Sequence, residues 1–437
     1  MTADLGGGEL VRRVGPTLRN TPGRTILRPF IPGRELVTVG VSRADAVVGR
    51  VLTLSEEQVD EILPHVVRQL APRHGEVRRL FREHADLAGS DLTDGVSMSP
   101  QRRELLGAYL TQEYAVEGAA LFNPSVVPHP HEPNDGGELP FVMTLRAVGE
   151  GHISSLELRT GVVSADGAVR IHHPGRRVVR PEIETPTAER ERGYRAVFAP
   201  DSRVSERVLF PVSADERQGI EDARLVPFRT DPDGPVEYLG TYTAYDGATV
   251  TSRLLSTTDF RTVETSALSG PVARDKGMAL FPRPVAGRRL AIARRDRETL
   301  VIADSRDGLC WNDTASLQQP RAPWELVQLG VCAPPVETAE GWLVITHGVG
   351  PVRQYSLGAL LLDLEDPTLV RGVLDEPLLT PTDEERIGYV PNVVYTCGAL
   401  VHGDFLLLPY ACSDLFVRFA VVDLRTLLDR LTTPRYH

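Results

Sequence analysis

The sequence predicts an all-β fold, a five-bladed β-propeller, with an N-terminal helical module ahead of it. Five times, an apolar strand runs into a turn and then a second strand that ends near an aspartate, and the first strands start at positions 140, 236, 287, 341 and 403. Apart from one long insertion in the first unit, this spacing suits one four-stranded blade per repeat. A β-sandwich with helical decoration would explain the strands, but it would not explain their recurrence.

The chain ahead of these repeats has a different sequence pattern. Its first thirty residues lack periodicity, and a short strand is expected over 35–54. Ser55 then precedes an acidic turn and apolar side chains at helical spacing up to Leu70, which predicts a helix, and further helices are expected over 76–87 and 100–117. The predicted domains are 1–54, an arm and strand; 55–118, a helical module packed on the propeller; and 119–437, the catalytic propeller.

The composition limits the classes of partner. The 437 residues carry 48 Lys and Arg against 59 Asp and Glu, and a net charge of -11 repels phosphate backbones, so nucleic acid is not an expected partner. No apolar run is long enough to span a bilayer and the opening residues lack a signal-peptide core, so we expect a cytoplasmic protein without membrane contact. The four cysteines fit no ligand spacing and no glycine-rich loop has phosphate-binding spacing, so neither a metal nor a cofactor is expected.

Polar residues at equivalent strand ends point to a ligand site. In a propeller these ends would meet at one mouth of a central channel, and the five repeats place Arg146, Tyr242, Arg294, His347 and Tyr410 there. Each residue alone would usually have a structural role. Together they predict a polar ligand site.

The densest polar segment outside the repeats is the E-D-x-R sequence of Glu221, Asp222 and Arg224. Adjacent carboxylates beside an arginine can have well-separated pKa values, because the cation keeps one carboxylate ionised while crowding raises the pKa of the other. By itself this pattern is also that of an ordinary solvated ion pair.

Nine motifs in a fixed order carry a resemblance to a known family. They are FNPSVV, GHISSLELRTG, SERVLFP, GIEDARLVPF, YTAYDG, KGMALFPR, PWELVQLG, PPVETAEGWLVITHGVGPVRQYSLGALLLDLEDP and GYVPNVVY. The chain resembles glycoside hydrolase family 130, the β-mannoside phosphorylases and β-1,2-mannosidases, over roughly residues 25–430. The resemblance implies a five-bladed propeller, in agreement with the repeat count.

The resemblance also implies roles for individual residues. Asp222 would be the general acid, with Glu221 and Arg224 setting its environment, and phosphorylases of the family are thought to pass its proton through a hydroxyl of the bound mannose. Lys276 and Arg294 match two basic positions that bind phosphate in the phosphorylases. The residues expected to hold the sugar are Asn123, Ser125, Arg146, His152 and Asp414, and His347 and Tyr355 are further expected substrate contacts.

One departure from the family pattern favours hydrolysis. Glu337 stands where the phosphorylases carry a third phosphate-binding lysine, and an anion there should repel phosphate. An inverting glycosidase needs a base that holds water opposite its acid, so Glu337 is the predicted base or water-positioning residue. Asp296 and Glu298 are candidate helpers.

The predicted function is therefore that of an inverting exo-β-1,2-mannosidase that releases mannose from mannoside oligosaccharides. The alternatives are a β-1,2-mannoside phosphorylase, with inorganic phosphate as second substrate, and a non-catalytic sugar-binding propeller. A homo-oligomer formed through the helical module is a further expectation. Lys276 is the only lysine among the 48 basic residues, which suggests that its position needs an ammonium group, and we expect it to contact mannoside hydroxyls.

Overall fold

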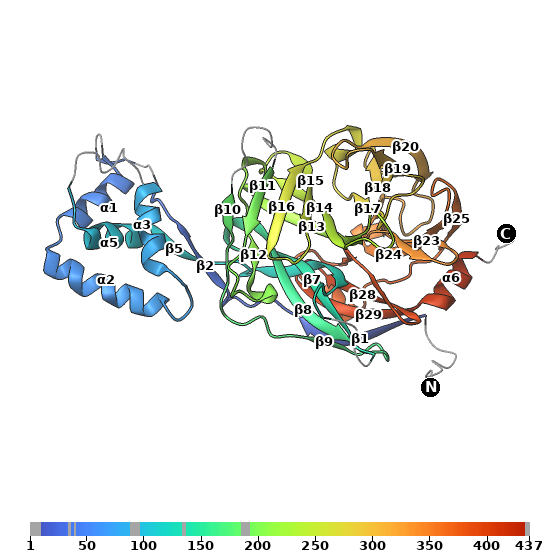
Figure 1. Cartoon of the computed structure of the whole chain (residues 1–437), viewed down its shortest axis with the longest axis horizontal. Helices are drawn as coiled ribbons and strands as arrows, with labels where there is room; N and C mark the ends of the chain where they lie inside the picture. The colour runs from blue at the N-terminus through green and yellow to red at the C-terminus, as the bar shows by residue number, and fades with distance from the viewer. Residues whose placement is uncertain are drawn as a thin grey trace. The chain divides into compact units, whose positions relative to one another are not determined.

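The protein consists mostly of β-strands, and its chain forms two compact units. The computed structural model describes residues 10–33, 36–38, 41–87, 97–132, 137–184 and 193–432. A β unit comprises Met1–Thr21, Glu117–Gly175 and Val179–His437, and a helical unit comprises Pro22–Val116 and Arg176–Val178. Figure 1 shows α1, α2, α3 and α5 in the helical unit and the long strands in the other.

The helical unit begins earlier than the predicted boundary at position 55. Strand β2, Thr25–Pro29, pairs antiparallel with β5, Thr111–Ala115, and these backbone hydrogen bonds join the segment before the helices to the segment after them. The helices are α1 (Arg43–Leu52), α2 (Glu56–Leu70), α3 (Val77–Leu87) and α5 (Pro100–Tyr109). The predicted third helix therefore ends at Tyr109, eight residues before its expected end, because the chain enters β5.

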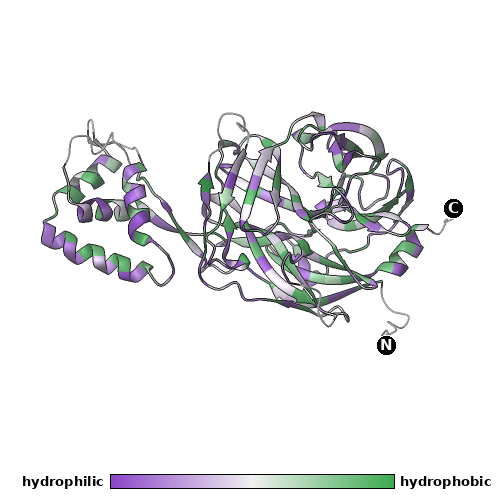
Figure 2. Cartoon of the chain, viewed as in Figure 1, coloured by the Kyte–Doolittle hydropathy of each residue, from purple (hydrophilic) through white to green (hydrophobic). Residues whose placement is uncertain are grey.

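The predicted strand over 35–54 is wrong for most of its length. Residues 35, 39 and 40 lie outside the described residues, and the strands β3, Leu36–Thr38, and β4, Val41–Ser42, are short. Helix α1 follows directly, because Ser42 and Asp45 cap its first turn reciprocally through side-chain to backbone hydrogen bonds. Helix α2 has the apolar face that the sequence predicts, and Figure 2 shows hydrophobic and hydrophilic residues alternating along its coil.

The β unit contains five groups of antiparallel strands. Group 1 is β6 (Ala120–Pro128), β7 (Leu139–Val148), β8 (Ser154–Val163), β9 (Val169–Ile171) and β12 (Val208–Leu209); group 2 is β13 (Gly219–Phe228), β14 (Glu237–Tyr245), β15 (Val250–Thr257), β16 (Thr262–Ala267), β11 (Gly193–Val197) and β10 (Glu182–Glu184). Group 3 is β17 (Ala279–Leu280), β18 (Arg289–Arg295), β19 (Thr299–Ser305) and β20 (Asn312–Gln318). Group 4 is β21 (Gln328–Val331), β22 (Val336–Thr338), β23 (Gly341–Val349), β24 (Tyr355–Leu362) and β25 (Val370–Val373); group 5 is β26 (Val394–Tyr395), β27 (Leu400–His402), β28 (Phe405–Cys412), β29 (Phe416–Asp423) and β1 (Val11–Leu18).

The core links these groups in a closed order. Four apolar clusters each join two groups that are consecutive in the chain, and a fifth cluster joins group 5 back to group 1, for example through Phe419 and Phe141. Groups 1 and 2 also form one continuous sheet through a single parallel pairing between Ser154 and Gly219. Helix α6, Leu424–Thr432, packs its buried leucines into the cluster between groups 4 and 5.

The five hairpins that the repeats predict are present as β7–β8, β14–β15, β18–β19, β23–β24 and β28–β29. The first strand of each hairpin is not the edge strand of its group, however, because β6, β13, β17, β21 and β26 lie outside it. Edge strands from different groups contact one another, as β6 and β13 do. None of the helices among the described residues is both long and apolar enough to cross a bilayer.

Candidate active site

Two matching bulges bring Asn123 and Asp222 together. The pairing of β6 with β7 shifts register between Phe122 and Ser125, and that of β13 with β14 shifts between Glu221 and Arg224. The bulged residues, Asn123 and Asp222, have φ values of 48° and 51°, in the left-handed region that Asn and Asp tolerate best among side-chain-bearing residues. The bulges turn both side chains out of their ladders, and Asn123 Nδ2 donates a 2.7 Å hydrogen bond to Asp222 Oδ1.

Cations surround the two carboxylates of the E-D-x-R segment. Arg146, from β7, donates to Glu221 Oε1 at 2.7 Å and lies 3.8 Å from Asp222 Oδ1, while Lys276 Nζ lies 2.5 Å from Glu221 Oε2. The buried Arg224 donates to the Asp222 backbone carbonyl. Burial raises the pKa of Asp222, but Arg146, Arg224, the hydrogen bond from Asn123 and Lys276 together outweigh it, so the pKa is lowered. Asp222 is therefore ionised at neutral pH in the free protein.

Arg224 joins strands of three groups behind the carboxylates. Its Nε donates to the Cys332 carbonyl at 3.0 Å, next to β21, and its Nη2 donates to the Tyr395 hydroxyl of β26 at 2.6 Å. The hydrogen bond from the guanidinium to the Asp222 carbonyl holds the backbone of Asp222 in place. The expectation that Arg224 sets the environment of Asp222 agrees with this geometry.

Asp414 adds a third carboxyl group with the opposite protonation behaviour. It lies in the turn between β28 and β29 with φ 51°. Burial is the main cause that raises the pKa of Asp414 to about 6. The negative charges of Asp222 and Glu221 raise it further, and the positive charges of Arg146 and Arg353 partly oppose the increase. Two neighbouring carboxyl groups thus have pKa values displaced in opposite directions.

Arg294 has hydrogen-bonding capacity that no described residue uses. Its side chain is 10% exposed, its Nη2 donates to the Lys276 carbonyl at 3.3 Å, and it lies 3.6 Å from Asp275 Oδ1. Its Nε and Nη1 atoms are buried and have no hydrogen-bond partner among the described residues, and the same holds for Asn123 Oδ1. Unsatisfied buried donors and acceptors are costly, so these atoms have the capacity to bind a group that the described residues do not supply.

A buried aromatic group adjoins these arginines. His347, on β23, stacks on Tyr355 with ring centroids 5.9 Å apart, and its ring meets Tyr395 edge-on at 4.9 Å. Burial, with Arg294 and Arg224, lowers the pKa of His347 well below its usual value, so the imidazole is neutral. Sequence reasoning missed Tyr395 as a member of the site, although it ends the GYVPNVVY motif.

Other predicted site residues have different surroundings. Ser125 is fully buried, and its Oγ accepts the Leu225 backbone N–H, so it joins β6 to β13. His152 is exposed in a turn with φ 58°. Tyr242 and Tyr410, which were expected at a channel mouth, are buried and donate to the carboxylates of Glu216 and Glu385 at 2.6 Å. Both hydroxyls are bound to carboxylates within the fold, so neither tyrosine lies among the residues around Asp222.

The predicted helpers of the base are engaged locally. Asp296 has φ 56° in the turn between β18 and β19, and its Oδ1 accepts the backbone N–H of Thr299 at 3.0 Å and that of Glu298. These hydrogen bonds lower the pKa of Asp296, with the Thr299 backbone N–H making the largest contribution. Glu298 itself is exposed.

Glu337 lines a cavity to which Asp222 and the residues around it do not contribute. Arg283 donates to both oxygens of its carboxylate, at 2.9 and 2.5 Å, and also lies over the Trp342 ring. Glu337 pairs with Trp342 at the start of β23, five residues before His347. It lines a cavity of about 750 Å³ that is walled largely by proline and aliphatic side chains; the lining includes Pro128, Pro227, Pro282, Pro334, Pro335 and Arg229.

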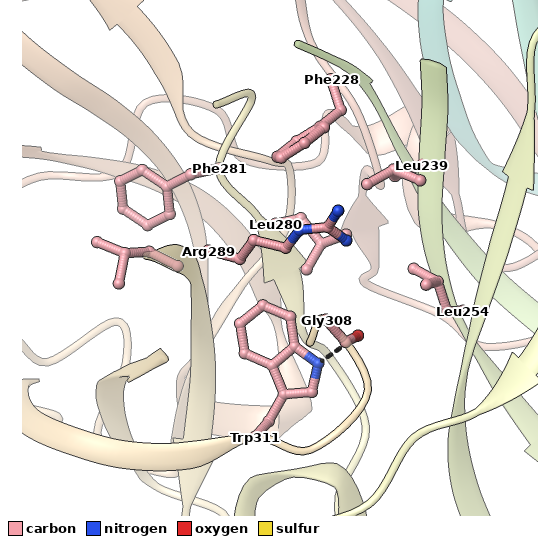
Figure 3. A pocket seen from close by; sticks show the side chains of 9 residues that line it. Phe228, Leu239, Leu254, Leu280, Phe281, Arg289, Gly308 and Trp311 are labelled. Atoms are coloured by element: carbon pink, nitrogen blue, oxygen red, sulfur yellow. Dashed lines mark hydrogen bonds between the residues drawn. The ribbon is translucent and has the colours of Figure 1, made fainter. Parts of the chain in front are cut away.

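A second hollow, in groups 2 and 3, is too small to hold a substrate. Figure 3 shows Phe228, Leu239, Leu280 and the Trp311 indole around it, with Trp311 Nε1 donating to the Gly308 carbonyl at 3.0 Å. Its volume of about 10 Å³ corresponds to about one water molecule. This hollow is therefore a packing defect in the core and not a candidate site.

Comparisons with known proteins identify related sequences. A model of glycoside hydrolase family 130, described as β-1,4-mannooligosaccharide phosphorylase, matches residues 201–433. A 1,2-β-oligomannan phosphorylase of Thermoanaerobacter sp. (strain X514) is 35% identical over 153 residues, which cover 35% of this chain and 51% of the relative. A β-1,2-mannobiose phosphorylase of Listeria innocua serovar 6a is 31% identical over 214 residues, 47% of this chain and 58% of the relative. The chain thus spans about half the length of the curated relatives it matches.

The fold has a counterpart among solved structures. The Listeria innocua β-1,2-mannobiose phosphorylase in complex with β-1,2-mannobiose superposes with a TM-score of 0.52 at 21% identity, covering 73% of this chain and 93% of that chain. At this identity the likeness concerns the fold alone.

The predicted hydrolysis is wrong. The sequence relatives are named phosphorylases, not hydrolases. The physical argument for hydrolysis also fails, because the Glu337 carboxylate is neutralised by Arg283 in a separate cavity and does not lie among the cations around Asp222. The position of Glu337 in the motif was therefore a poor guide to its electrostatic role, and its assignment as a water-activating base has no support.

Proposed function

Because the chain belongs to glycoside hydrolase family 130, we propose that it is a β-mannoside phosphorylase that cleaves short β-1,2-linked mannosides with inorganic phosphate and releases mannose 1-phosphate. The observation that carries the proposal is the pair of buried, unpartnered donors of Arg294 beside Lys276. A phosphate ion needs several charged donors, and a planar guanidinium can offer two at once.

We propose that the five strand groups form the five blades of a β-propeller. The closed order of the five core clusters supports this arrangement, because each blade of a propeller packs on the next and the last packs on the first. Strand β1 pairs with β29, so a strand from the start of the chain completes the final group. The edge strands that carry Asn123, Asp222 and Tyr395 would then line the central channel.

In the proposed reaction, a phosphate oxygen attacks the anomeric carbon as the glycosidic oxygen leaves with a proton. Asp222 supplies that proton, directly or through a hydroxyl of the bound mannose as the family resemblance implies. In the free protein its pKa is lowered by neighbouring cations. Bound phosphate would neutralise part of that positive charge and exclude water, and both changes raise the pKa of Asp222 toward the value that an acid needs.

The sugar would be held by groups on the other side of the same cluster. Asn123 Oδ1 has an unfilled acceptor site while its amide nitrogen is committed to Asp222, so it can accept a hydrogen bond from a sugar hydroxyl. Asp414 and Arg146 border Asp222 and can accept from and donate to further hydroxyls. Lys276 is committed to Glu221, and its contact with the mannoside stays a prediction.

The test is a phosphorolysis assay. Incubation of the protein with β-1,2-mannobiose and inorganic phosphate should produce mannose and mannose 1-phosphate in equal amounts. The mannose 1-phosphate is measured by ³¹P NMR. Omission of phosphate should stop turnover. Free mannose released equally fast without phosphate would overturn the proposal, as would inactivity in both conditions. A parallel reaction with β-1,4-mannobiose tests the linkage, and preference for that substrate would contradict the β-1,2 assignment.

A further inference from the structure

Three large apolar side chains remain exposed beside the candidate site. Val352, Ile387 and Tyr389 are 82%, 75% and 67% exposed, and the Tyr389 ring contacts the predicted site residue His152. Exposed apolar side chains that adjoin a polar site often belong to a binding surface. We name the segment 383–393 the Tyr389 loop.

The Tyr389 loop is tied to the turn that carries Asp414. The Val390 N–H donates to the Ser413 carbonyl at 3.0 Å, and the Ser413 N–H donates to the Val393 carbonyl at 2.8 Å. The Ser413 hydroxyl also donates to the carbonyl of Glu385, at 2.7 Å. The position of Tyr389 relative to Asp414 is therefore fixed by a side-chain hydrogen bond before Tyr389 and by two backbone hydrogen bonds after it.

A second set of contacts fixes the loop against group 4. Arg386 donates to Gln354 Oε1 at 3.1 Å and to Asn392 Oδ1 at 3.0 Å, and the Tyr355 N–H donates to the Asn392 carbonyl at 2.9 Å. The loop thus joins the turn before β24 to the turn after β28. An aromatic side chain on such a well-tied loop loses little conformational entropy when it binds a ligand.

The ring of Tyr389 meets the predicted sugar-binding residue His152. Their ring centroids are 5.6 Å apart with an interplanar angle of 34°, and both side chains are exposed. Asp414 and Asp222 interact electrostatically, so the Asp414 turn that anchors the loop borders the proposed acid. The exposed ring of Tyr389 therefore adjoins the residues expected to hold the mannose, through its contact with His152, without being one of them.

We propose that Tyr389 is a specificity-determining residue whose ring packs against the sugar unit on the leaving side of the cleaved bond. The proposal rests on the proposed function for the identity of the bond. One face of a pyranose carries C–H groups that pack on an aromatic ring, and the exposed ring with a neighbouring imidazole offers both an apolar surface and a hydrogen-bonding edge. The occupant is thus the second mannose of a β-1,2-mannoside, and not the mannose that is transferred.

Binding measured without phosphate tests this inference separately from catalysis. Isothermal titration calorimetry of wild-type protein and Tyr389→Ala with β-1,2-mannobiose and with mannose compares ligands that do and do not reach the platform. We expect Tyr389→Ala to weaken mannobiose binding by about ten-fold, as the loss of one well-packed aromatic contact does, and to leave mannose binding unchanged. Tyr389→Phe should retain the wild-type affinity. Leu369→Ala, at an exposed leucine between β24 and β25, is the matched control and should change neither affinity.

The inference would be overturned by unchanged mannobiose binding by Tyr389→Ala or by an equal loss for mannose and mannobiose. A change of oligomeric state in light scattering would overturn it too, because it would identify the exposed side chains as a contact between copies of the chain. Absence of mannobiose binding by the wild-type protein would also overturn it. If mannobiose binding depends on Tyr389 but phosphate yields no mannose 1-phosphate, the proposed function fails while the assignment of Tyr389 stands.

Discussion

Glu216 is fully buried and Asp222 is largely buried, and the two carboxylates lie only six positions apart, yet their surroundings differ. Glu216 accepts hydrogen bonds from the Tyr242 hydroxyl at 2.6 Å, from the backbone N–H groups of Val212 and Ser213, and from Tyr194. Asp222, on a strained bulge, accepts one side-chain hydrogen bond among the described residues, from Asn123. Burial of a charge alone therefore does not distinguish a reactive carboxylate from a structural one.

Group 5 contains another carboxylate that, like Glu216, accepts several hydrogen bonds from the protein. Glu385 caps its own turn at Thr382 and accepts the Tyr410 hydroxyl at 2.6 Å, as Glu216 caps the turn at Ser213 and accepts Tyr242. In both places the tyrosine lies on the second strand of a group. Such carboxylates lock a turn to a strand, whereas Asp222 and its neighbours keep free capacity in Asn123 Oδ1 and Arg294.

The largest expected effect is a loss of activity when Asp222 is replaced, which is not expected when Glu216 is replaced. Asp222→Asn removes the proposed proton donor, so the rate of mannose 1-phosphate formation should fall by about 10³-fold, within the range of general-acid catalysis. The melting temperature should stay within a few degrees of that of the wild-type protein. Initial rates with β-1,2-mannobiose and phosphate measure the effect, and a variant with wild-type rates would place the acid elsewhere.

The reverse result is expected for Glu216. Glu216→Gln should lower the free energy of unfolding by about 2–4 kcal/mol, because buried groups lose a charged partner, and leave kcat near the wild-type value. Urea unfolding followed by fluorescence measures the change. Glu384→Gln, at the mostly exposed glutamate next to Glu385, is the control and should change stability little. A Glu216→Gln variant that is as stable as the wild type but inactive would contradict the structural role assigned to Glu216.

The third carboxyl group, Asp414, is tested by the pH dependence of the free energy of unfolding. Its pKa is raised from 3.8 to about 6, so the folded protein holds this proton more tightly than the unfolded chain, and the free energy of unfolding falls as the pH rises between those values. Asp414→Asn removes this loss and should be more stable than wild type at pH 7 by about 2–3 kcal/mol, and by less near pH 4. Melting temperatures at the two pH values check this, and an equal difference at both would contradict the raised pKa.

The smallest effect is expected at Glu337. Since its carboxylate pairs with Arg283 in a partly exposed setting, Glu337→Gln should change the phosphorolysis rate and the KM for phosphate by less than about two-fold. A large fall in rate would show that the cavity around Glu337 takes part in the reaction after all.

The sequence predicted those features that depend on local pattern. The E-D-x-R motif located Asp222, and the recurring strand pairs located all five hairpins. Two of the edge strands, β17 and β26, were missed because each is two residues long, too short to show a period of two. Tyr242 and Tyr410 were placed at the channel mouth.

Other features depend on contacts that a linear pattern does not contain. The bulge at Asp222 is visible only in the pairing with β14, and the partner of Glu337, Arg283, lies 54 residues away in the chain. Helix α1 had a local signal, the pairing of Ser42 with Asp45, but its ten residues lie among short strands and were read as part of one. The family resemblance supplied roles for residues, and it also misled where Glu337 replaced a lysine.

The most direct test of the account is the place where phosphate binds. In a crystal soaked with phosphate, the account predicts a phosphate oxygen at about 2.7–3.2 Å from Arg294 Nε or Nη1. Arg294→Met should raise the dissociation constant for phosphate, measured by calorimetry, by about ten-fold or more. Phosphate bound instead between Arg229 and Arg283, with unchanged affinity in Arg294→Met, would contradict the claim that the unfilled capacity beside Asp222 is the active site.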